Sequence, residues 1–310
     1  MAKIAVIGSG IAGMSCAWLA SASDSAHVAL FEAAPTLGMD AHSVDVVLPG
    51  KDGSPTPMRI DVPLRVFSED YYPNLCALYR HLGLELHRED YSASMHQASS
   101  SSSSPSDSCY FKYENFKVGA LSICFVNSLR MIFSTKFLQI AVDALRFFRL
   151  ARRAVRRDQL EQTASLTFGE WLRANRFSSA FVDYFIVPTM ACVCTCTNAS
   201  AAGYPADLTI RYLCDRFHVG VLRVAAGTIE VTQKLTQRVK DVRLRVCVAS
   251  VEPASGGGVV VVSADGKREL FDHVVFATQA NTAARLLGNH PAFANQVDVL
   301  TAIRYESSQA

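Results

Sequence analysis

Lys-Ile-Ala-Val-Ile-Gly-Ser-Gly-Ile-Ala-Gly, residues 3–13, decides the fold of this chain of 310 residues. Residues 3–7 form a largely apolar run that ends at glycine, which predicts a buried strand of a parallel sheet. Residues 14–22 follow with a pattern typical of a helix, and residues 27–31 form a second apolar strand that ends at Glu32. The order strand, turn, helix, strand predicts one β-α-β unit within about thirty residues.

The three glycines follow the spacing G-x-G-x-x-G, and each has a mechanical role. Gly8 allows a tight turn after the strand, Gly10 lets a pyrophosphate approach the backbone, and Gly13 lets the helix pack closely on the sheet. The N–H groups and the positive dipole end at the start of the helix favour phosphates. Glu32 lies 19 positions after Gly13. A carboxylate there can accept hydrogen bonds from both hydroxyls of an adenosine ribose and would repel the 2′-phosphate of NADP. The motif in this context predicts a dinucleotide-binding site.

The rest of the chain alternates between helix-like and strand-like segments. Helices are predicted for residues 73–83, 119–157, 167–172, 181–187, 228–239 and 281–287, and strands for residues 45–48, 58–62, 91–96, 109–113, 244–251, 259–263 and 272–278. Pro188 is expected to end or kink the helix before it. A helical middle between two α/β parts indicates one discontinuous domain, residues 1–65 plus 220–310, interrupted by a second domain, residues 66–219.

The composition is that of an ordinary globular protein, with 50% hydrophobic residues, 19% charged residues and a formal net charge of +2. The small net charge gives no indication of nucleic-acid binding. No apolar run reaches the roughly 18 residues that span a bilayer, and a strand-turn-helix explains the N-terminus better than a secretory signal. The nine cysteines have no regular spacing, so we expect reduced, mostly buried thiols and a cytoplasmic protein.

Several segments resemble the FAD-dependent amine oxidase superfamily. The stretch Phe31-Glu-Ala-Ala-Pro-Thr-Leu-Gly38 is similar to the family's signature after the second strand, where a loop leads to a paired glycine beside the phosphates of FAD. Further segments resemble the branch of FAD-dependent amine-oxidase-like oxidoreductases found beside cyclopropane-fatty-acid synthases: residues 3–20, 66–75, 82–86, 91–95, 166–172, 186–190 and 271–278. The resemblance implies a Rossmann-like α/β fold, in which a discontinuous FAD/NAD(P)-binding domain carries an inserted, largely helical substrate domain.

The resemblance also implies a cofactor site and a reaction. The residues that would contact FAD are Gly8, Ser9, Gly10, Ala12, Gly13, Glu32, Gly38 and, near the adenine through its backbone, Val248. The reaction would be hydride transfer from an unknown amine or lipid-linked substrate to the flavin, with no catalytic base identified.

The chain departs from the family pattern in four places, one of which is a shorter segment between Phe217 and Ala226. Met39 replaces the second paired glycine, and Pro63 replaces a glycine after Asp61-Val62. The chain also stops at Ala310, before the family's final FAD-binding segment. We therefore keep two alternatives to a complete oxidoreductase, namely a truncated or non-catalytic protein that binds a nucleotide weakly or acts as an interaction module, and an NAD-binding dehydrogenase.

Cys192, Cys194 and Cys196 alternate along the chain. On a strand the three thiols would share one face, but a fourth ligand is not evident nearby, and structural zinc sites prefer two pairs of ligands. We expect buried thiols rather than a metal site or a redox disulfide.

Six arginines fall between Arg146 and Arg157, on a stretch whose apolar residues recur at helical spacing, namely Leu138, Val142, Leu145 and Phe148. The stretch predicts a helix with one core face and one solvated face. The alternative is an amphipathic basic helix in weak contact with an anionic membrane surface.

Overall fold

The computed structural model describes residues 1–38, 42–49, 53–62, 65–89, 93–96, 109–118, 121–125, 134–156, 165–216, 221–288 and 290–305. The chain divides into two compact units: unit 1 consists of residues 1–66, 74–87 and 223–305, and unit 2 of residues 67–73, 88–222 and 306–310. Residues 74–87 belong to the unit of the glycine turn, whereas the boundaries derived from the sequence place them in the inserted segment. The division falls inside the strands β5 (Leu86–Glu89) and β9 (Val221–Val224).

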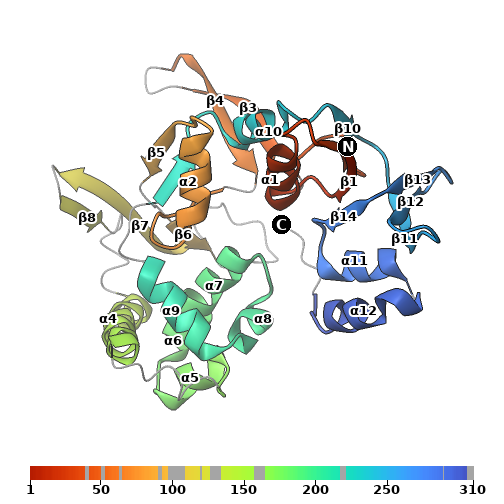
Figure 1. The fold of residues 1–310 in the computed structure, drawn as a ribbon. Helices are drawn as coiled ribbons and strands as arrows, with labels where there is room; N and C mark the ends of the chain where they lie inside the picture. Colours follow the sequence, from red (N-terminus) through yellow and green to blue (C-terminus); the bar gives the residue numbers. More distant parts are fainter. Residues whose placement is uncertain are drawn as a thin grey trace. The chain divides into compact units, whose positions relative to one another are not determined.

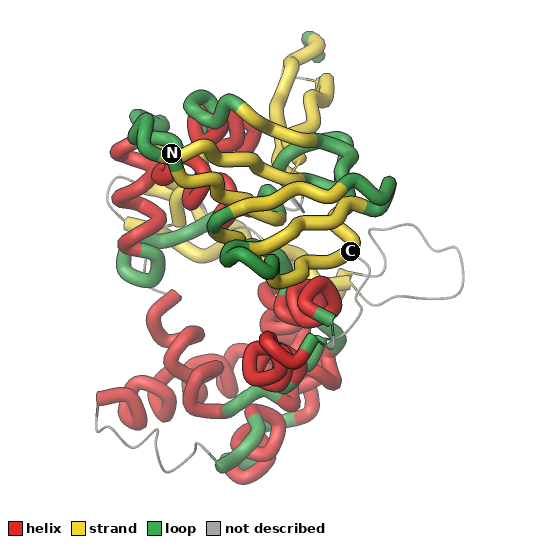
Figure 2. Tube along the Cα trace, turned by 45° about the vertical axis from the view of Figure 1, so that its right-hand side comes forward, coloured by secondary structure: helices red, strands yellow, loops and turns green. Residues whose placement is uncertain are grey.

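A four-stranded parallel sheet is the main sheet of unit 1 (Figures 1 and 2). Its strands lie in the order β10 (Asp241–Arg243), β2 (Ala26–Phe31), β1 (Ala2–Ile7) and β14 (His273–Phe276). Alternate side chains of a strand point to opposite faces. Val6 and Leu30 are fully buried on one face, and Ala5 and Phe31 are at most 1% exposed on the other. Burial on both faces explains the continuous apolar runs, and the predicted Rossmann-like α/β fold is confirmed.

Helix α1 (Ile11–Ala20) packs against β1, β2 and α10 (Thr228–Thr236). Trp18 of α1 meets His81 of α2 (Pro73–His81) edge to face, with ring centroids 5.6 Å apart. The guanidinium of Arg238, just after α10, lies 5.2 Å from the centroid of the same indole. Three segments that are distant in sequence are thus joined around Trp18.

A hydrophobic cluster in unit 1 joins the parallel sheet to an antiparallel sheet and a helix. The elements are β11 (Val248–Pro253), β12 (Val259–Ser263), β13 (Arg268–Phe271) and α11 (Ala280–Leu287). Phe31 contacts Phe271, with ring centroids 5.9 Å apart, and Leu286 is buried beside them. A short 3-10 helix, η3 (Pro291–Phe293), then leads to α12 (Ala294–Thr301), which packs beside α11 (Figure 1).

The strands predicted for residues 45–48 and 58–62 are present as β3 (His42–Pro49) and β4 (Pro55–Val62), which pair antiparallel as a hairpin. Asp61 of β4 accepts hydrogen bonds from the Thr228 N–H at 3.0 Å, the Thr228 hydroxyl at 3.1 Å and the Ser43 hydroxyl at 2.7 Å. Helix α10 begins after Gly227, which has no side chain to cap it. Asp61 therefore supplies the acceptor that an N-cap residue normally provides.

Unit 2 contains a three-stranded antiparallel sheet and a group of helices. The strands lie in the order β6 (Ala93–His96), β7 (Cys109–Val118) and β8 (Leu121–Phe125). The helices are α4 (Thr135–Arg156), α5 (Phe168–Ala174), α6 (Ser179–Phe181), α7 (Val187–Cys194), α8 (Asn198–Gly203) and α9 (Ala206–Arg216), with a π-helical turn, η2 (Val182–Ile186), between α6 and α7. The strands predicted for residues 91–96 and 109–113 are present as β6 and β7 and pair antiparallel. Residues 97–108 between them, which include six consecutive serines, lie outside the described residues.

Aromatic side chains form the core of the helices in unit 2. Phe147 of α4 contacts a ring of partners, all with centroids within 6.3 Å of its own, namely Phe148, Phe168, Trp171, Phe177 and Phe181. The helix predicted for residues 167–172 is present as α5 and begins with a capping box, because the Thr167 side chain accepts from the Glu170 N–H and the Glu170 side chain accepts from the Thr167 N–H.

Several predicted boundaries differ from the structure. The helix predicted for residues 119–157 begins only at Thr135, because residues 121–125 pair with β7 as a strand. The strand predicted for residues 244–251 begins at Val248, after Arg245 at φ 59°, and the strand predicted for 272–278 is shortened to β14. Pro188 does not end the helix, because the π-turn η2 precedes it and Pro188 occupies the first turn of α7, where its missing N–H is tolerated.

Candidate dinucleotide-binding site

The glycine turn joins β1 to α1 and is closed by backbone contacts. Gly8 has φ 102°, a conformation that favours glycine, and its N–H donates to the Phe31 carbonyl at 2.9 Å. A Cβ on Gly8 would lie 2.6 Å from the carbonyl oxygen of Ala277, and a Cβ on Gly13 would lie 1.9 Å from the carbonyl oxygen of Gly8. Neither position accepts a side chain without a backbone shift. The closest neighbour of Gly13 is therefore the turn itself, and the side chain of Ala277, just after β14, follows at 3.0 Å from the same Cβ position.

Gly10 differs from the other two glycines. Its φ of −63° and ψ of 174° suit any residue, and a Cβ built on it would meet nothing within 4 Å. No side chain caps α1, which begins at the next residue, so the first N–H groups of the helix have no intrahelical partner. Ala12, in this first turn, is exposed. Open space beside the positive end of a helix suits a phosphate group.

The carboxylate of Glu32 points at the glycine turn. Its Oε2 accepts from the Ser9 N–H at 3.1 Å and from the Ser9 hydroxyl at 2.5 Å, while Oε1 accepts from the Ala34 N–H at 2.8 Å. A carboxylate has about four acceptor positions, so donors of the chain itself occupy three of them. A ribose could use the remaining position, and a second one only after the Ser9 hydroxyl rotates away.

Ser9 also connects the turn to the loop that ends at Gly38. The Gly38 N–H donates to the Ser9 hydroxyl at 3.1 Å and lies 3.2 Å from the Ser9 carbonyl oxygen. Ser9 is fully buried, and Gly38 has φ 84°. The structure thus gathers Ser9, Glu32 and Gly38 into one cluster. Met39 and Pro63, where the chain departs from the family pattern, lie outside the described residues.

Val248 lies on the same side of the parallel sheet as Phe31. It begins β11, is 6% exposed and packs in one hydrophobic cluster with Phe31. Two residues earlier, the Val246 N–H donates to the Glu32 carbonyl at 2.9 Å. The start of β11 is therefore fixed to the strand end that carries Glu32.

An ionic cluster that the sequence pattern does not predict lies beside β2. Arg243 stacks 4.8 Å from the centroid of Phe31, donates to both carboxylate oxygens of Asp241 and pairs with Glu269. The hydrogen bond from Arg243 holds the pKa of Asp241 below its usual value, and the same bond raises the pKa of Arg243. Burial pushes the pKa of Glu269 upward, but hydrogen bonds from Arg243 and Lys267 outweigh it and leave this pKa lowered. Which arginine takes part depends on strand pairing, which the sequence alone does not show.

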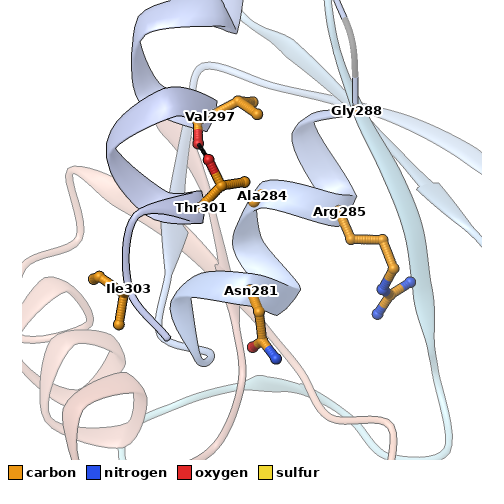
Figure 3. Close-up of a pocket in the computed structure, with 7 residues that line it drawn as sticks. All are labelled: Asn281, Ala284, Arg285, Gly288, Val297, Thr301 and Ile303. Atoms are coloured by element: carbon orange, nitrogen blue, oxygen red, sulfur yellow. Dashed lines mark hydrogen bonds between the residues drawn. The ribbon is translucent and has the colours of Figure 1, made fainter. Parts of the chain in front are cut away.

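A separate hollow of about 480 Å³ lies in unit 1 (Figure 3). Its lining comes from α11, α12 and the residues that follow, namely Asn281, Ala284, Arg285, Gly288, Val297, Thr301 and Ile303. None of the eight predicted cofactor residues borders it. The lining has one cation and no carboxylate, so we assign no cofactor and no acid–base pair to this hollow.

The three closely spaced cysteines lie at the end of helix α7 and just after it, not on a strand, and the prediction that these thiols are buried is wrong. Cys192 is exposed, and Cys194 and Cys196 are half-buried, because Thr195 between them turns the chain with φ 49°. Burial first, and the neighbouring Cys196 second, raise the pKa of the Cys194 thiol, which disfavours the thiolate that binds metals. Within the described ranges no cluster of His, Cys, Asp or Glu side chains is arranged to hold a metal ion.

Comparison with known families identifies one part of the chain. The family model described as an NAD(P)-binding Rossmann-like domain matches residues 6–82, which include the glycine turn, Glu32 and Gly38. No protein of curated function matches the sequence. Among the helices that the structure describes, none combines the length and the apolar character needed to cross a membrane.

Several solved structures share the fold. Putrescine oxidase with bound putrescine matches with a TM-score of 0.56 and 17% identity, over 92% of this chain and 60% of that protein. An oxidoreductase from Methanosarcina mazei matches with a TM-score of 0.55 and 12% identity, over 97% and 65%. A candidate protoporphyrinogen oxidase from Exiguobacterium sp. matches with a TM-score of 0.53 and 15% identity, over 95% and 63%. At these identities the likeness shows the fold, and the chain spans 60–65% of the length of these three proteins.

Proposed function

We propose that this chain is an FAD-dependent oxidoreductase of the amine-oxidase-like type, which transfers a hydride from an amine or lipid-linked substrate to the flavin. The observation that carries the proposal is the open space over Gly10, between the uncapped start of α1 and the carboxylate of Glu32. The shared fold with putrescine oxidase supports it, as does the resemblance of residues 31–38 to the FAD-dependent amine oxidase signature.

The residues present fit a dinucleotide. Gly10 leaves room for the pyrophosphate, and the first N–H groups of α1, including that of Ala12, supply donors for it. Glu32 offers its remaining acceptor position to the adenosine ribose, and its negative charge opposes the 2′-phosphate of NADP. Gly38 and the backbone of Val248 would border the cofactor on either side. When bound, the flavin supplies the acceptor for the hydride.

The chain's own groups preorganise this site. Gly8 and Gly13 hold the turn in a conformation that larger residues cannot adopt. The N–H groups of Ser9 and Ala34 fix the carboxylate of Glu32 at the turn, so little reorganisation is needed when the ribose arrives. We propose no catalytic base.

One observation favours a second candidate, a nucleotide-binding or interaction protein without catalysis. Ser9 and Ala34 already occupy three acceptor positions of Glu32. A ribose that donates both hydroxyls to Glu32 must therefore displace the Ser9 hydroxyl for its second hydrogen bond, which weakens binding because an existing hydrogen bond is lost for that one.

The experiment that separates the two candidates uses the whole purified chain. The protein is incubated with FAD, freed of unbound FAD by gel filtration, and its absorbance spectrum is recorded. Aliphatic diamines and aromatic amines are then added without oxygen. Retained flavin that an amine bleaches supports the oxidoreductase, whereas retained flavin that no amine bleaches supports the second candidate. A colourless protein overturns the FAD assignment.

A further inference from the structure

Helix α4 exposes apolar side chains that the sequence pattern assigned to the core. Ile140 and Phe147 are at most 1% exposed and face the aromatic cluster of unit 2. Leu138, Val142 and Leu145 are 50%, 61% and 72% exposed. These three residues recur at intervals of four and three, so they line one side of the helix. The prediction that they form the core face is wrong, and the solvated side of α4 is itself apolar in its first half.

The same side of the helix continues into cations. Arg149 and Arg153 follow at the same spacing and are exposed. We call the exposed row formed by Leu138, Val142, Leu145, Arg149 and Arg153 the α4 stripe. The acidic residue of α4, Asp143, is 7% exposed, and it lies on the core side, where it accepts from the Ser178 N–H at 2.8 Å. The α4 stripe therefore carries positive charge with no acid within it.

Arg146, the first arginine of the predicted basic stretch, does not belong to the stripe. Its guanidinium donates to Asp143 at 2.7 Å and to the carbonyl groups of Asn175 and Arg176, and it lies 4.5 Å from the centroid of the Phe177 ring. These contacts hold α4 against its own unit. Arg157, the last arginine of the stretch, lies outside the described residues.

We propose that the α4 stripe docks on an anionic membrane surface. Interfacial helices bury an apolar face at the boundary of headgroups and acyl chains, while their cations contact anionic lipids. Leu138, Val142 and Leu145 would occupy that boundary, and Arg149 and Arg153 would contact lipid phosphates. The sequence left a weak membrane contact as an alternative, and these residues are the ones that we propose make it.

The charge pattern of the stripe argues against a second copy of this chain as the occupant. A rise of about 1.5 Å per residue makes the apolar half about 10 Å long and the cationic half about 6 Å long. Parallel pairing of two copies would place arginine beside arginine. Antiparallel pairing along the whole stripe would place the apolar half of one copy on the cationic half of the other, and pairing of the apolar halves alone would leave the arginines without a partner surface. A membrane surface instead offers hydrocarbon and anionic phosphate at every point along the helix.

The inference goes beyond the proposed function and does not depend on it. The stripe belongs to unit 2 and contains none of the predicted cofactor residues. A chain that does not bind FAD would not contradict the membrane proposal, and a chain that does not bind membranes would not contradict the proposed cofactor site.

The test is co-sedimentation of the full chain with vesicles of phosphatidylcholine, with and without about 30 mol% phosphatidylglycerol. We expect binding to the anionic vesicles that declines as salt is added. Arg149→Gln with Arg153→Gln should lower the partition coefficient by about fivefold for each arginine removed. Val142→Ser with Leu145→Ser should lower it by about tenfold, because the apolar contact is lost.

Two matched variants serve as controls. Val299→Ser removes an apolar side chain that is 69% exposed on α12, and Arg173→Gln removes an exposed cation in the last turn of α5. Both should leave vesicle binding unchanged. All of these side chains are exposed, so thermal midpoints and circular dichroism should match those of the unchanged chain.

Four outcomes would overturn the proposal. The first is that the chain does not sediment with anionic vesicles, and the second is that it sediments equally with neutral ones. The third is that the stripe variants bind vesicles as well as the unchanged chain does. The fourth is that the chain does not bind vesicles but forms a dimer, or a complex with an acidic peptide, that depends on Leu145.

Discussion

Gly10 and Gly13 stand in the same turn, yet a methyl group would meet opposite surroundings at the two positions. At Gly13 it would collide with the backbone of Gly8, and at Gly10 it would enter open space. One glycine is therefore required for the turn to close, and the other leaves room beside a closed turn. Within this one motif, Gly13 therefore serves the folding of the turn, and Gly10 serves the binding of a ligand.

Gly13→Ala should lower the free energy of unfolding of unit 1 by about 2–4 kcal/mol, because the backbone must shift to relieve the contact. Gly10→Ala should change it by less than about 1 kcal/mol, which is the size of an N-cap effect. Urea unfolding followed by the fluorescence of Trp18, in a Trp171→Phe background, measures both values. Equal losses in the two variants would contradict the geometry of the turn.

Asp241 gives the chain an acid-sensitive contribution. Its pKa is lowered in the folded state by the hydrogen bond from Arg243, so the ionised form stabilises the fold above the unfolded pKa of about 3.9. That contribution is lost as the pH falls through the lowered value. Asp241→Asn should cost about 1–2 kcal/mol at pH 7 and much less near pH 3. Urea midpoints of both proteins at the two pH values test this, and a difference that does not change with pH would contradict it.

At the scale of elements, helix α4 shows what the spacing of apolar residues can and cannot predict. The apolar spacing correctly predicts a helix, but α4 has apolar residues on both sides, and the pattern cannot tell which side is buried. Which side is buried depends on packing partners that only the tertiary structure supplies, such as Trp171 of α5, which contacts Phe147. Strand β8 lies within the helix predicted for residues 119–157, although its residues alternate as those of a strand do. Its pairing with β7 decides its conformation.

Phe147→Ala should lower the free energy of unfolding of unit 2 by about 3–5 kcal/mol, since it empties the centre of the aromatic cluster. Leu145→Ala, two residues away and 72% exposed, should change it by less than about 0.5 kcal/mol. Fluorescence of Trp171 in a Trp18→Phe background reports on this unit. A larger loss for Leu145→Ala than for Phe147→Ala would mean that the other face of α4 is buried.

Local rules account for much of unit 1. Spacings within the first 62 residues are enough to predict the β-α-β unit, the hairpin and the acid after the second strand. In unit 2, the spacing of Thr167 and Glu170 likewise predicts the capping box of α5. The contacts that complete the site do not follow from such rules. The occupation of Glu32 by Ser9 and Ala34, and the Arg243 cluster, depend on how distant segments meet.

At the scale of the whole molecule, unit 1 is assembled from three separate parts of the chain. Asp61 joins two of them, since its partner Thr228 is 167 positions away. Asp61→Ala should lower the stability of unit 1 by about 1–2 kcal/mol, because it uncaps α10, and hydrogen exchange should speed up at the start of that helix. Asp45→Ala, on the same hairpin but paired with Arg59 at the surface, is the matched control and should leave exchange in α10 unchanged. Identical exchange in both variants would contradict this role of Asp61.

The central claim is that the glycine turn of unit 1 holds FAD. Calorimetric titration of the whole chain with FAD, in the unchanged protein and in Gly10→Leu, tests it most directly. We predict saturable binding of one FAD per chain, weakened by more than about a hundredfold in the variant, a loss of roughly 3 kcal/mol, while the two thermal midpoints stay close. Equal affinities in the two proteins, or no binding by the unchanged chain, would contradict the account.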